Sequence, residues 1–186
     1  MTPEEGAVVV TRRAKLYAKV KGLGGMALVH LAFPQICQEL GSRRDIVAAI
    51  YSSPLSSVIS GELAALDEYL SDLKKRNIKT FRVNTDIPFH SPMLEDLVGP
   101  LEKALGFSLN PRPAKVPLYS TSYVDARTDD IRNVDYWTNN MVNPVYLHGS
   151  VEAALDDGLC IFLEVSTHPI VAQSNNLLAR RSRREI

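Results

Sequence analysis

Residues 25–83 alternate between two kinds of hydrophobic pattern, one typical of strands and one typical of helices. Four short segments are rich in apolar and β-branched residues, which predicts strands. These segments are residues 26–33, 45–51, 56–60 and 78–83. Two segments between them, residues 34–41 and 63–73, place apolar residues at helical spacing. The order strand–helix–strand–strand–helix–strand predicts a ferredoxin-like unit.

The rest of the chain predicts a mixed α/β structure. A capping pattern at Thr2, Pro3 and Glu5 begins a helix that we expect to end before Gly22. Later helices are predicted over residues 134–141 and 145–155 and from His168 to about Leu178, and strands over residues 116–120 and 159–165. The last of these strands is a continuous apolar run, which is the pattern of a buried parallel strand.

The backbone around His90 is predicted to change from extended to helical. Ile87 precedes Pro88, and the residue before a proline favours extended geometry. Ser91 is a good helix N-cap, and Pro92 suits the first helical position. One apolar stripe follows at helical spacing: Leu94, Leu97, Val98, Leu101 and Leu105. His90 at this junction is a candidate general base, and a structural or solvated histidine is the alternative that the spacing leaves open.

The composition is that of a soluble globular domain, with 45% hydrophobic and 23% charged residues. The 21 basic and 21 acidic side chains cancel, so no overall charge favours nucleic acid or an anionic membrane. We interpret the basic run Arg180–Arg184 as a solvated tail. Since no apolar run reaches membrane-spanning length and the first residues contain no signal-peptide core, we expect a soluble, cytoplasmic protein.

Several patterns exclude other kinds of site. Cys37 and Cys160 have apolar neighbours, which predicts buried, reduced thiols rather than a disulfide. Neither the cysteines nor the histidines have metal-ligand spacing, so we predict no metal site. The glycine-rich segment from Gly22 to Gly25 lacks the spacing of a phosphate-binding loop and is interpreted as a hinge into a strand.

Four motifs in a fixed order carry a resemblance to a known family. They are Asp86-Ile-Pro-Phe-His-Ser-Pro-Met93, Val116-Pro-Leu-Tyr-Ser-Thr-Ser122, Tyr136-Trp-Thr-Asn-Asn-Met-Val-Asn-Pro-Val145 and Phe162-Leu-Glu-Val-Ser-Thr-His-Pro-Ile170. Together they resemble acyltransferase domains of type I polyketide synthases, and the sequence is most similar to the partially reducing 6-methylsalicylic acid type. The resemblance extends over essentially the whole chain.

The resemblance implies the C-terminal part of an acyltransferase domain. In the family, a ferredoxin-like small subdomain is inserted into a larger α/β-hydrolase-like subdomain, and the active site lies between them. Residues 1–24 and 84–186 would belong to the larger subdomain, and residues 25–83 to the insert. The family's nucleophile is a serine in a Gly-His-Ser-x-Gly elbow. Because this sequence has no G-x-S-x-G, the family pattern places that serine before residue 1.

The implied activity is transfer of a malonyl extender unit from coenzyme A to an acyl carrier protein, through a serine acyl-enzyme and without a cofactor. The implied partners are the acyl carrier protein, neighbouring synthase domains, the coenzyme A thioester and the missing N-terminal half of the acyltransferase. Neither nucleic acid nor a membrane is expected. Two other hypotheses remain open: a non-catalytic remnant or carrier-protein docking module, and a free-standing ferredoxin-like binding protein.

The resemblance assigns four site residues. His90 would be the general base, and the main-chain carbonyl of Asn140 would fix its tautomer. Spacing alone leaves Arg12 and Arg13 as solvated helix charges. The resemblance favours Arg13 as the partner of the malonyl carboxylate, to which a guanidinium donates two parallel bonds. Phe89 would favour malonyl over methylmalonyl, because its ring fills the space that a C2 methyl group needs.

Overall fold

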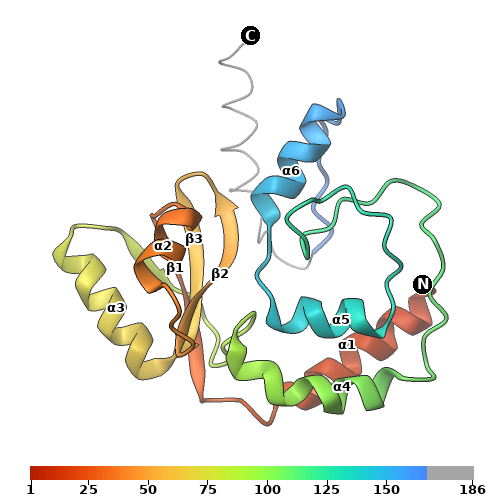
Figure 1. Cartoon of the computed structure of the whole chain (residues 1–186), viewed down its shortest axis with the longest axis horizontal. Coiled ribbons are helices and arrows are strands. Elements are labelled where there is room, and N and C mark those ends of the chain that lie inside the picture. Colours follow the sequence, from red (N-terminus) through yellow and green to blue (C-terminus); the bar gives the residue numbers. More distant parts are fainter. Residues whose placement is uncertain (167–186) are drawn as a thin grey trace.

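The computed structural model describes residues 1–166, which form two adjoining parts (Figure 1). A sheet with two helices forms one part, and the remaining helices with a long loop form the other. The predicted helix from His168 to about Leu178 and the basic run Arg180–Arg184 lie outside the described residues.

The first part has the element order that periodicity predicted. Its elements are β1 (Gly24–Val29), α2 (Phe33–Leu40), β2 (Ile46–Ser53), β3 (Ser56–Glu62), α3 (Leu63–Lys75) and β4 (Thr80–Arg82). The strands lie in the order β2-β3-β1-β4, and each neighbouring pair is antiparallel. The last strand is shorter than the predicted segment 78–83.

The two faces of the sheet contact different parts of the molecule. Successive residues of a strand point to opposite faces. Ala27 and Val29 are fully buried in the core that the sheet forms with α2 and α3. Met26 points the other way and forms a second cluster with Ala49, and the side chain of Phe89 packs against this cluster. The second face therefore supports the segment that carries His90.

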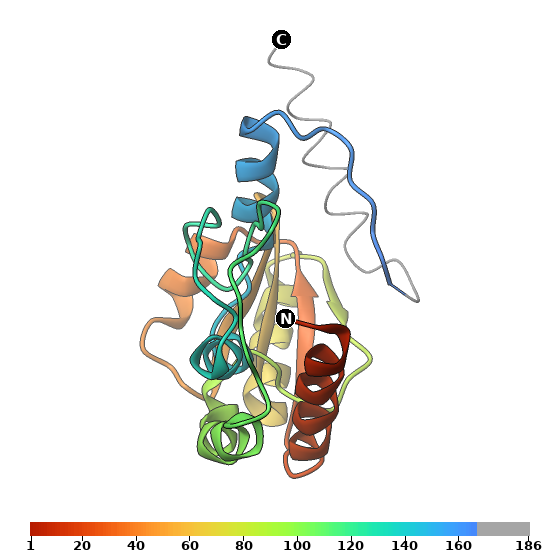
Figure 2. The same cartoon turned by 90° about the vertical axis from the view of Figure 1, so that its right-hand side faces the viewer.

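The second part is a layer of helices. It contains α1 (Pro3–Tyr17), the 3₁₀ helix η1 (Pro92–Leu97), α4 (Val98–Leu105), α5 (Val134–Val142) and α6 (Leu147–Asp156). The predicted capping box begins α1: the Thr2 hydroxyl accepts from the Glu5 N–H at 3.2 Å, and the Glu5 carboxylate accepts from the Thr2 N–H at 2.6 Å. The predicted stripe is buried, with Leu94, Leu101 and Leu105 at 0% exposure. These leucines share a core with α1 and α5, which lie beside α4 in Figure 2.

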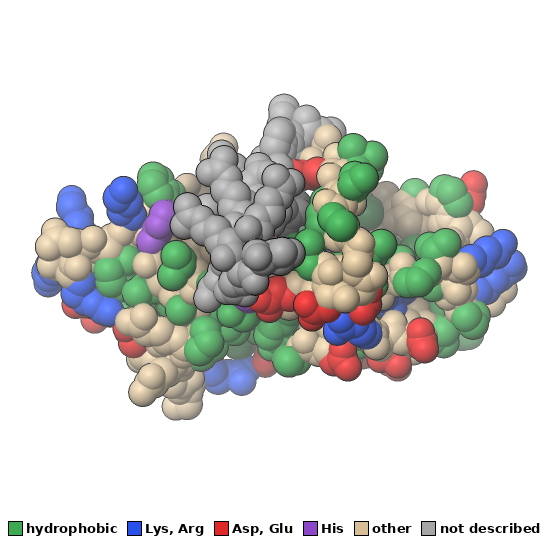
Figure 3. Space-filling view, turned by 90° about the horizontal axis from the view of Figure 1, so that it is seen from above, with side chains coloured by type: hydrophobic (Ala, Val, Ile, Leu, Met, Phe, Trp, Pro, Cys, Tyr) green, Lys and Arg blue, Asp and Glu red, His purple; other side chains and the backbone are tan. Residues whose placement is uncertain are grey.

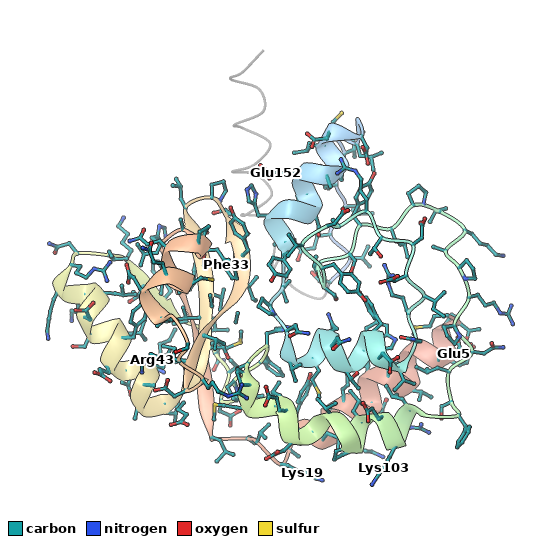
Figure 4. All side chains as sticks on the ribbon, viewed as in Figure 1. Glu5, Lys19, Phe33, Arg43, Lys103 and Glu152 are labelled. Atoms are coloured by element: carbon teal, nitrogen blue, oxygen red, sulfur yellow. The ribbon has the colours of Figure 1, made fainter. Side chains whose placement is uncertain are left out.

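Backbone bonds and aromatic contacts join the two parts. Val145 forms a single parallel bridge to β2, because it accepts from the Tyr51 N–H and donates to the Ala49 carbonyl, both at 2.8 Å. Phe33, which is labelled in Figure 4, stacks on Tyr51 and contacts the edge of Tyr146. The segment between α5 and α6 is therefore fixed against the sheet.

Two predicted strands are not formed. Residues 116–120 contribute only an isolated bridge. Residues 159–165 form no strand, and Ile161 and Leu163 are 94% and 87% exposed. In Figure 2 this segment follows α6 and runs apart from the sheet. An apolar run becomes a buried strand only when a neighbouring strand pairs with it, and no described residue does so here.

The prediction of buried thiols is also wrong, since both cysteines are exposed. Cys37 lies on the outer side of α2, whereas Ile36 and Leu40 of the same helix point into the core. Successive helical residues point about 100° apart, so an apolar neighbour in sequence does not imply burial. Cys160 belongs to the exposed run described above.

The surface carries charges of both signs. Basic and acidic side chains both lie on the face seen in Figure 3, in keeping with the equal numbers of the two in the sequence. Within residues 1–166 no helix combines the length and the apolar character that crossing a membrane requires.

Candidate active site

His90 lies in a tight turn rather than at the end of an extended strand. Its φ is +57°, in the left-handed region that residues other than glycine seldom adopt. Ser91 occupies the predicted N-cap position of η1, but its hydroxyl makes no capping bond. It donates instead to the Pro88 carbonyl at 2.7 Å, which stabilises the turn. Pro88 is fully buried against Gly24, where an added Cβ would lie 2.7 Å from the Pro88 Cβ. The sheet and the turn together fix the backbone of the histidine.

The His90 imidazole is half-buried and hydrogen-bonded to the main chain. Its Nδ1 lies 3.0 Å from the Asn143 carbonyl oxygen. A carbonyl can only accept, so this bond places the proton on Nδ1 and leaves the Nε2 lone pair available. Burial lowers the pKa of His90, the Asn143 carbonyl opposes that shift, and the positive charge of Arg13 adds to it. Burial and the Arg13 charge therefore favour the neutral ring, which can accept a proton.

The accepting carbonyl belongs to Asn143, whereas the resemblance assigned this role to Asn140. Asn143 follows the last residue of α5 in extended backbone geometry, so its carbonyl leaves the helical direction and meets the ring. The Asn140 carbonyl also faces the ring closely enough to raise the pKa of His90. It has no helical partner because the residue four positions later is Pro144, which lacks an N–H. Both carbonyls thus act on the histidine, and the 3.0 Å bond is to Asn143.

Arg13 lies on the face of α1 that is turned toward α5. Its Nη1 donates to the Asn140 side-chain oxygen at 2.8 Å, and its Nε and Nη2 donate to the Tyr17 hydroxyl at 3.1 and 2.8 Å. The guanidinium is half-buried and forms no ion pair with an acidic residue of the described part of the chain. Asn140 joins Arg13 and His90 into one site, because its side-chain oxygen accepts from Arg13 and its main-chain carbonyl faces the His90 ring, whose pKa the Arg13 charge lowers.

The neighbouring Arg12 points toward a different helix. Its Nη1 donates to the Ala104 carbonyl at the end of α4 and to the Ser108 hydroxyl, the second bond at 2.6 Å. These contacts join α1 to α4. The arginine that faces the His90 site is therefore Arg13, the one that the resemblance favoured.

Phe89 is half-buried between the sheet and α1. It packs against Met26, Ala49 and Val58 on the second face of the sheet. The Tyr17 ring contacts it edge-to-face, with ring centroids 4.9 Å apart. The structure thus brings together the four residues that the resemblance assigned, from α1, the histidine turn and α5.

A cavity of about 160 Å³ opens beside the His90 ring. Its walls are Val47, Ala48, His90, Pro92, Glu95, Val142, Asn143 and Pro144. Two larger grooves, of about 450 and 580 Å³, follow residues 111–118 and are lined by none of the four site residues. The two larger grooves therefore do not coincide with the candidate site.

The arrangement suits a reaction that moves a proton and binds an anion. His90 presents a neutral nitrogen that can accept a proton from a hydroxyl or thiol group. Arg13 presents a positive charge that no described acidic residue neutralises. Among residues 1–166 no group of three or more His, Cys, Asp or Glu side chains is placed to hold a metal ion.

Sequence reasoning missed Tyr17, Ser122 and Asn143. Tyr17 is four residues after Arg13 and so lies on the same helix face, a spacing that could have revealed it. Ser122 accepts from the Asn140 side-chain N–H at 2.9 Å. It belongs to an irregular loop, where no periodic signal indicates what a side chain will meet.

Comparison with known proteins gives consistent matches. A family model described as "Acyl transferase domain" matches residues 1–180. The chain is 58% identical over 174 residues to mellein synthase of Phaeosphaeria nodorum and 55% identical over 174 residues to 6-methylsalicylic acid synthase of Aspergillus terreus. Each alignment covers 94% of this chain and 10% of the relative, so the chain spans about a tenth of their length. The acyltransferase domain of the polyketide synthase PpsC of Mycobacterium tuberculosis superposes with a TM-score of 0.91 at 30% identity, covering 98% of this chain and 56% of that one.

Proposed function

The chain belongs to the acyl transferase domain family, and we propose that it carries the catalytic base and the substrate-binding arginine of a polyketide synthase acyltransferase domain. The proposed reaction moves a malonyl unit from coenzyme A to an acyl carrier protein. One observation supports this most strongly: the half-buried Arg13 has no acidic partner among the described residues and lies beside a neutral histidine. That pair suits a substrate that carries both a reactive thioester and a free carboxylate.

We assign the nucleophile to a serine outside this chain. His90 Nε2 accepts the proton of the serine hydroxyl while the serine oxygen attacks the thioester carbonyl. The carbon–sulfur bond then breaks, a malonyl ester remains on the serine, and His90 returns the proton to the coenzyme A thiolate. The phosphopantetheine thiol of the carrier protein attacks this ester, His90 accepts its proton, and the serine oxygen takes that proton back as it leaves. The scheme uses no cofactor.

The bond between His90 and Asn143 gives the ring the tautomer that this scheme needs. Nδ1 keeps its proton in the bond to Asn143, and Nε2 would face the reacting groups. The orienting group is a neutral carbonyl, whereas a Ser-His-Asp triad uses a carboxylate for the same purpose. General-base catalysis of this kind contributes about 100-fold or more to the rate.

Two contacts would select the substrate. A carboxylate bound to Arg13 gains a charge-assisted pair of about 1.5–3 kcal/mol, which an acetyl thioester cannot form. The Phe89 ring, packed between the sheet and Tyr17, would occupy the space beside the reacting carbon, and forcing one further methyl group into packed space costs about 1–3 kcal/mol. We propose that the first contact favours malonyl over acetyl and the second favours malonyl over methylmalonyl.

We also infer how the chain fits into a complete domain. Residues 25–83 would be a ferredoxin-like subdomain inserted into an α/β-hydrolase-like subdomain formed by residues 1–24 and 84–186. The strand order β2-β3-β1-β4 supports this assignment. The exposed apolar run at 159–165 supports pairing with strands of the N-terminal half of the domain, outside this chain. The carrier protein and the neighbouring synthase domains would be the partners of the assembled enzyme.

Covalent loading of the full-length protein tests the proposed function. The protein is incubated with malonyl-CoA, and the modified peptide is identified by mass spectrometry. We expect a malonyl ester on a serine outside these 186 residues. Absence of any ester would favour a non-catalytic docking module, and stoichiometric malonylation within this chain would overturn the assignment of the nucleophile.

A further inference from the structure

We propose that Tyr17 and the side chain of Asn140 are positioning residues for Arg13. They fix the guanidinium through two neutral acceptors, so that its charge stays available for the substrate carboxylate. This inference rests on the proposed function and adds residues that determine the preference for malonyl over acetyl.

The geometry around the guanidinium supports a directed group rather than a mobile one. The Tyr17 hydroxyl accepts two of its N–H groups and the Asn140 oxygen accepts a third. A guanidinium has five N–H donors, so two remain for a ligand. Two donors match the two oxygens of one carboxylate.

The neutrality of both acceptors distinguishes Arg13 from Arg127 and Arg76, which donate to carboxylates. Arg127 donates to both carboxylate oxygens of Asp157, at 3.0 and 3.1 Å, and Arg76 pairs with Glu39 at 2.8 Å. In those pairs the carboxylate fixes the arginine and also cancels its charge. A phenol and an amide fix the direction of Arg13 without cancelling its charge, which a site for an anionic substrate requires.

Both acceptors are themselves fixed by contacts outside the arginine. The Tyr17 ring packs edge-to-face on Phe89, and the Asn140 side-chain N–H donates to the Ser122 hydroxyl at 2.9 Å. One tyrosine therefore contacts both the arginine that would bind the carboxylate and the ring that would limit the space at C2. A change at Tyr17 should alter substrate choice although the side chain performs no proton transfer.

The test is competitive loading of malonyl-CoA and acetyl-CoA by the full-length protein. Tyr17→Phe keeps the ring contact with Phe89 and removes only the hydroxyl. We expect the preference for malonyl over acetyl to fall about tenfold, mainly through a higher KM for malonyl-CoA, since two hydrogen bonds to Arg13 are lost. Tyr119→Phe is the matched control, because it removes a hydroxyl that bonds to Asp157 away from the site, and it should leave the preference unchanged.

Asn140→Asp provides a second variant of nearly the same shape. Its carboxylate would pair with Arg13 and cancel the charge, so the preference should fall by roughly ten- to a hundredfold. The new negative charge should also move the pH–rate profile to higher pH, because it favours the charged form of His90. If the role of Asn140 were purely structural, Asn140→Asp would lower the loading rates of both thioesters by the same factor and would not shift the pH–rate profile.

The proposal is overturned if Tyr17→Phe and Asn140→Asp both keep the wild-type preference, or if each lowers the loading of the two thioesters by the same factor. Arg13→Ala separates this failure from failure of the proposed function. If Arg13→Ala changes the preference while both positioning variants do not, only the positioning roles are wrong. If Arg13→Ala changes nothing, the carboxylate-binding role is wrong as well.

Discussion

Replacing Arg13 with alanine in the full-length protein should change which thioester is loaded. The side chain lies outside the buried clusters, so we expect the domain to fold and the acetyl thioester to remain a substrate. Loss of a charge-assisted hydrogen bond costs about 1.5–3 kcal/mol. Since 1.4 kcal/mol corresponds to a factor of ten, the preference for malonyl over acetyl should fall roughly ten- to a hundredfold.

The assay is single-turnover loading from an equimolar mixture of malonyl-CoA and acetyl-CoA, with the two acyl-enzymes separated by mass. Arg12→Ala is the matched control on the adjacent position of the same helix. It loses the bonds to Ala104 and Ser108, which join α1 to α4, so it should lower the melting temperature and leave the acyl preference unchanged.

Two results would refute the reasoning about this helix face. One is an equal change of preference in Arg12→Ala and Arg13→Ala, which would indicate a general loss of packing. The other is a change in Arg12→Ala alone, which would mean that the guanidinium facing the substrate is not the one that faces His90.

Three further predictions concern stability. Arg76 lowers the pKa of Glu39 to about 2, so Glu39 stabilises the fold above its ordinary pKa of 4.5, and this contribution is lost as the pH falls from 4.5 toward 2. In urea unfolding, Glu39→Gln should lower the free energy of unfolding by about 1 kcal/mol at pH 7, a modest value because the ion pair is partly exposed. Near pH 2 the substitution should change this free energy by almost nothing, and an equal loss at both pH values would contradict the ion pair. Gly61→Ala should destabilise the fold by about 1–3 kcal/mol, because the new Cβ would lie 2.2 Å from a backbone oxygen. A Cβ at Gly99 meets nothing within 4 Å, so Gly99→Ala should leave the stability unchanged or raise it. Equal melting temperatures of the two variants would refute the steric reasoning. Leu101→Ala should cost about 2–5 kcal/mol in the same unfolding assay because the side chain is fully buried, and a loss below 1 kcal/mol would show that the helical core is loose.

The element order of residues 25–83 could be predicted because each segment has its own hydrophobic periodicity and ends at a residue that interrupts the pattern. The start of α1 could be predicted for the same local reason, since the side chains of Thr2 and Glu5 each accept a hydrogen bond from the backbone N–H of the other residue. The run at 159–165 could not, because pairing of a strand depends on a neighbour that the segment itself does not specify.

The site was predictable only where chemistry and local sequence coincide. His90 stood out because the prolines and the serine around it predict a change from extended to helical backbone, and the structure forms a tight turn at that junction. The role of Asn143 depends on the residue at which α5 ends, and sequence patterns define a helix end only to within one or two residues. The contact between Tyr17 and Phe89 joins segments more than seventy residues apart, and a single sequence carries no signal for such a pair.

Titration of the His90 ring by NMR in the full-length protein or its isolated complete domain tests most directly whether Arg13 and His90 form one site. We predict a pKa below the ordinary value of 6.5 in the wild type, because burial and the Arg13 charge both disfavour the imidazolium. Arg13→Ala should raise the pKa of His90, and Arg12→Ala should leave it unchanged. A wild-type pKa above 6.5, or a His90 pKa that does not move in Arg13→Ala, would contradict a shared site.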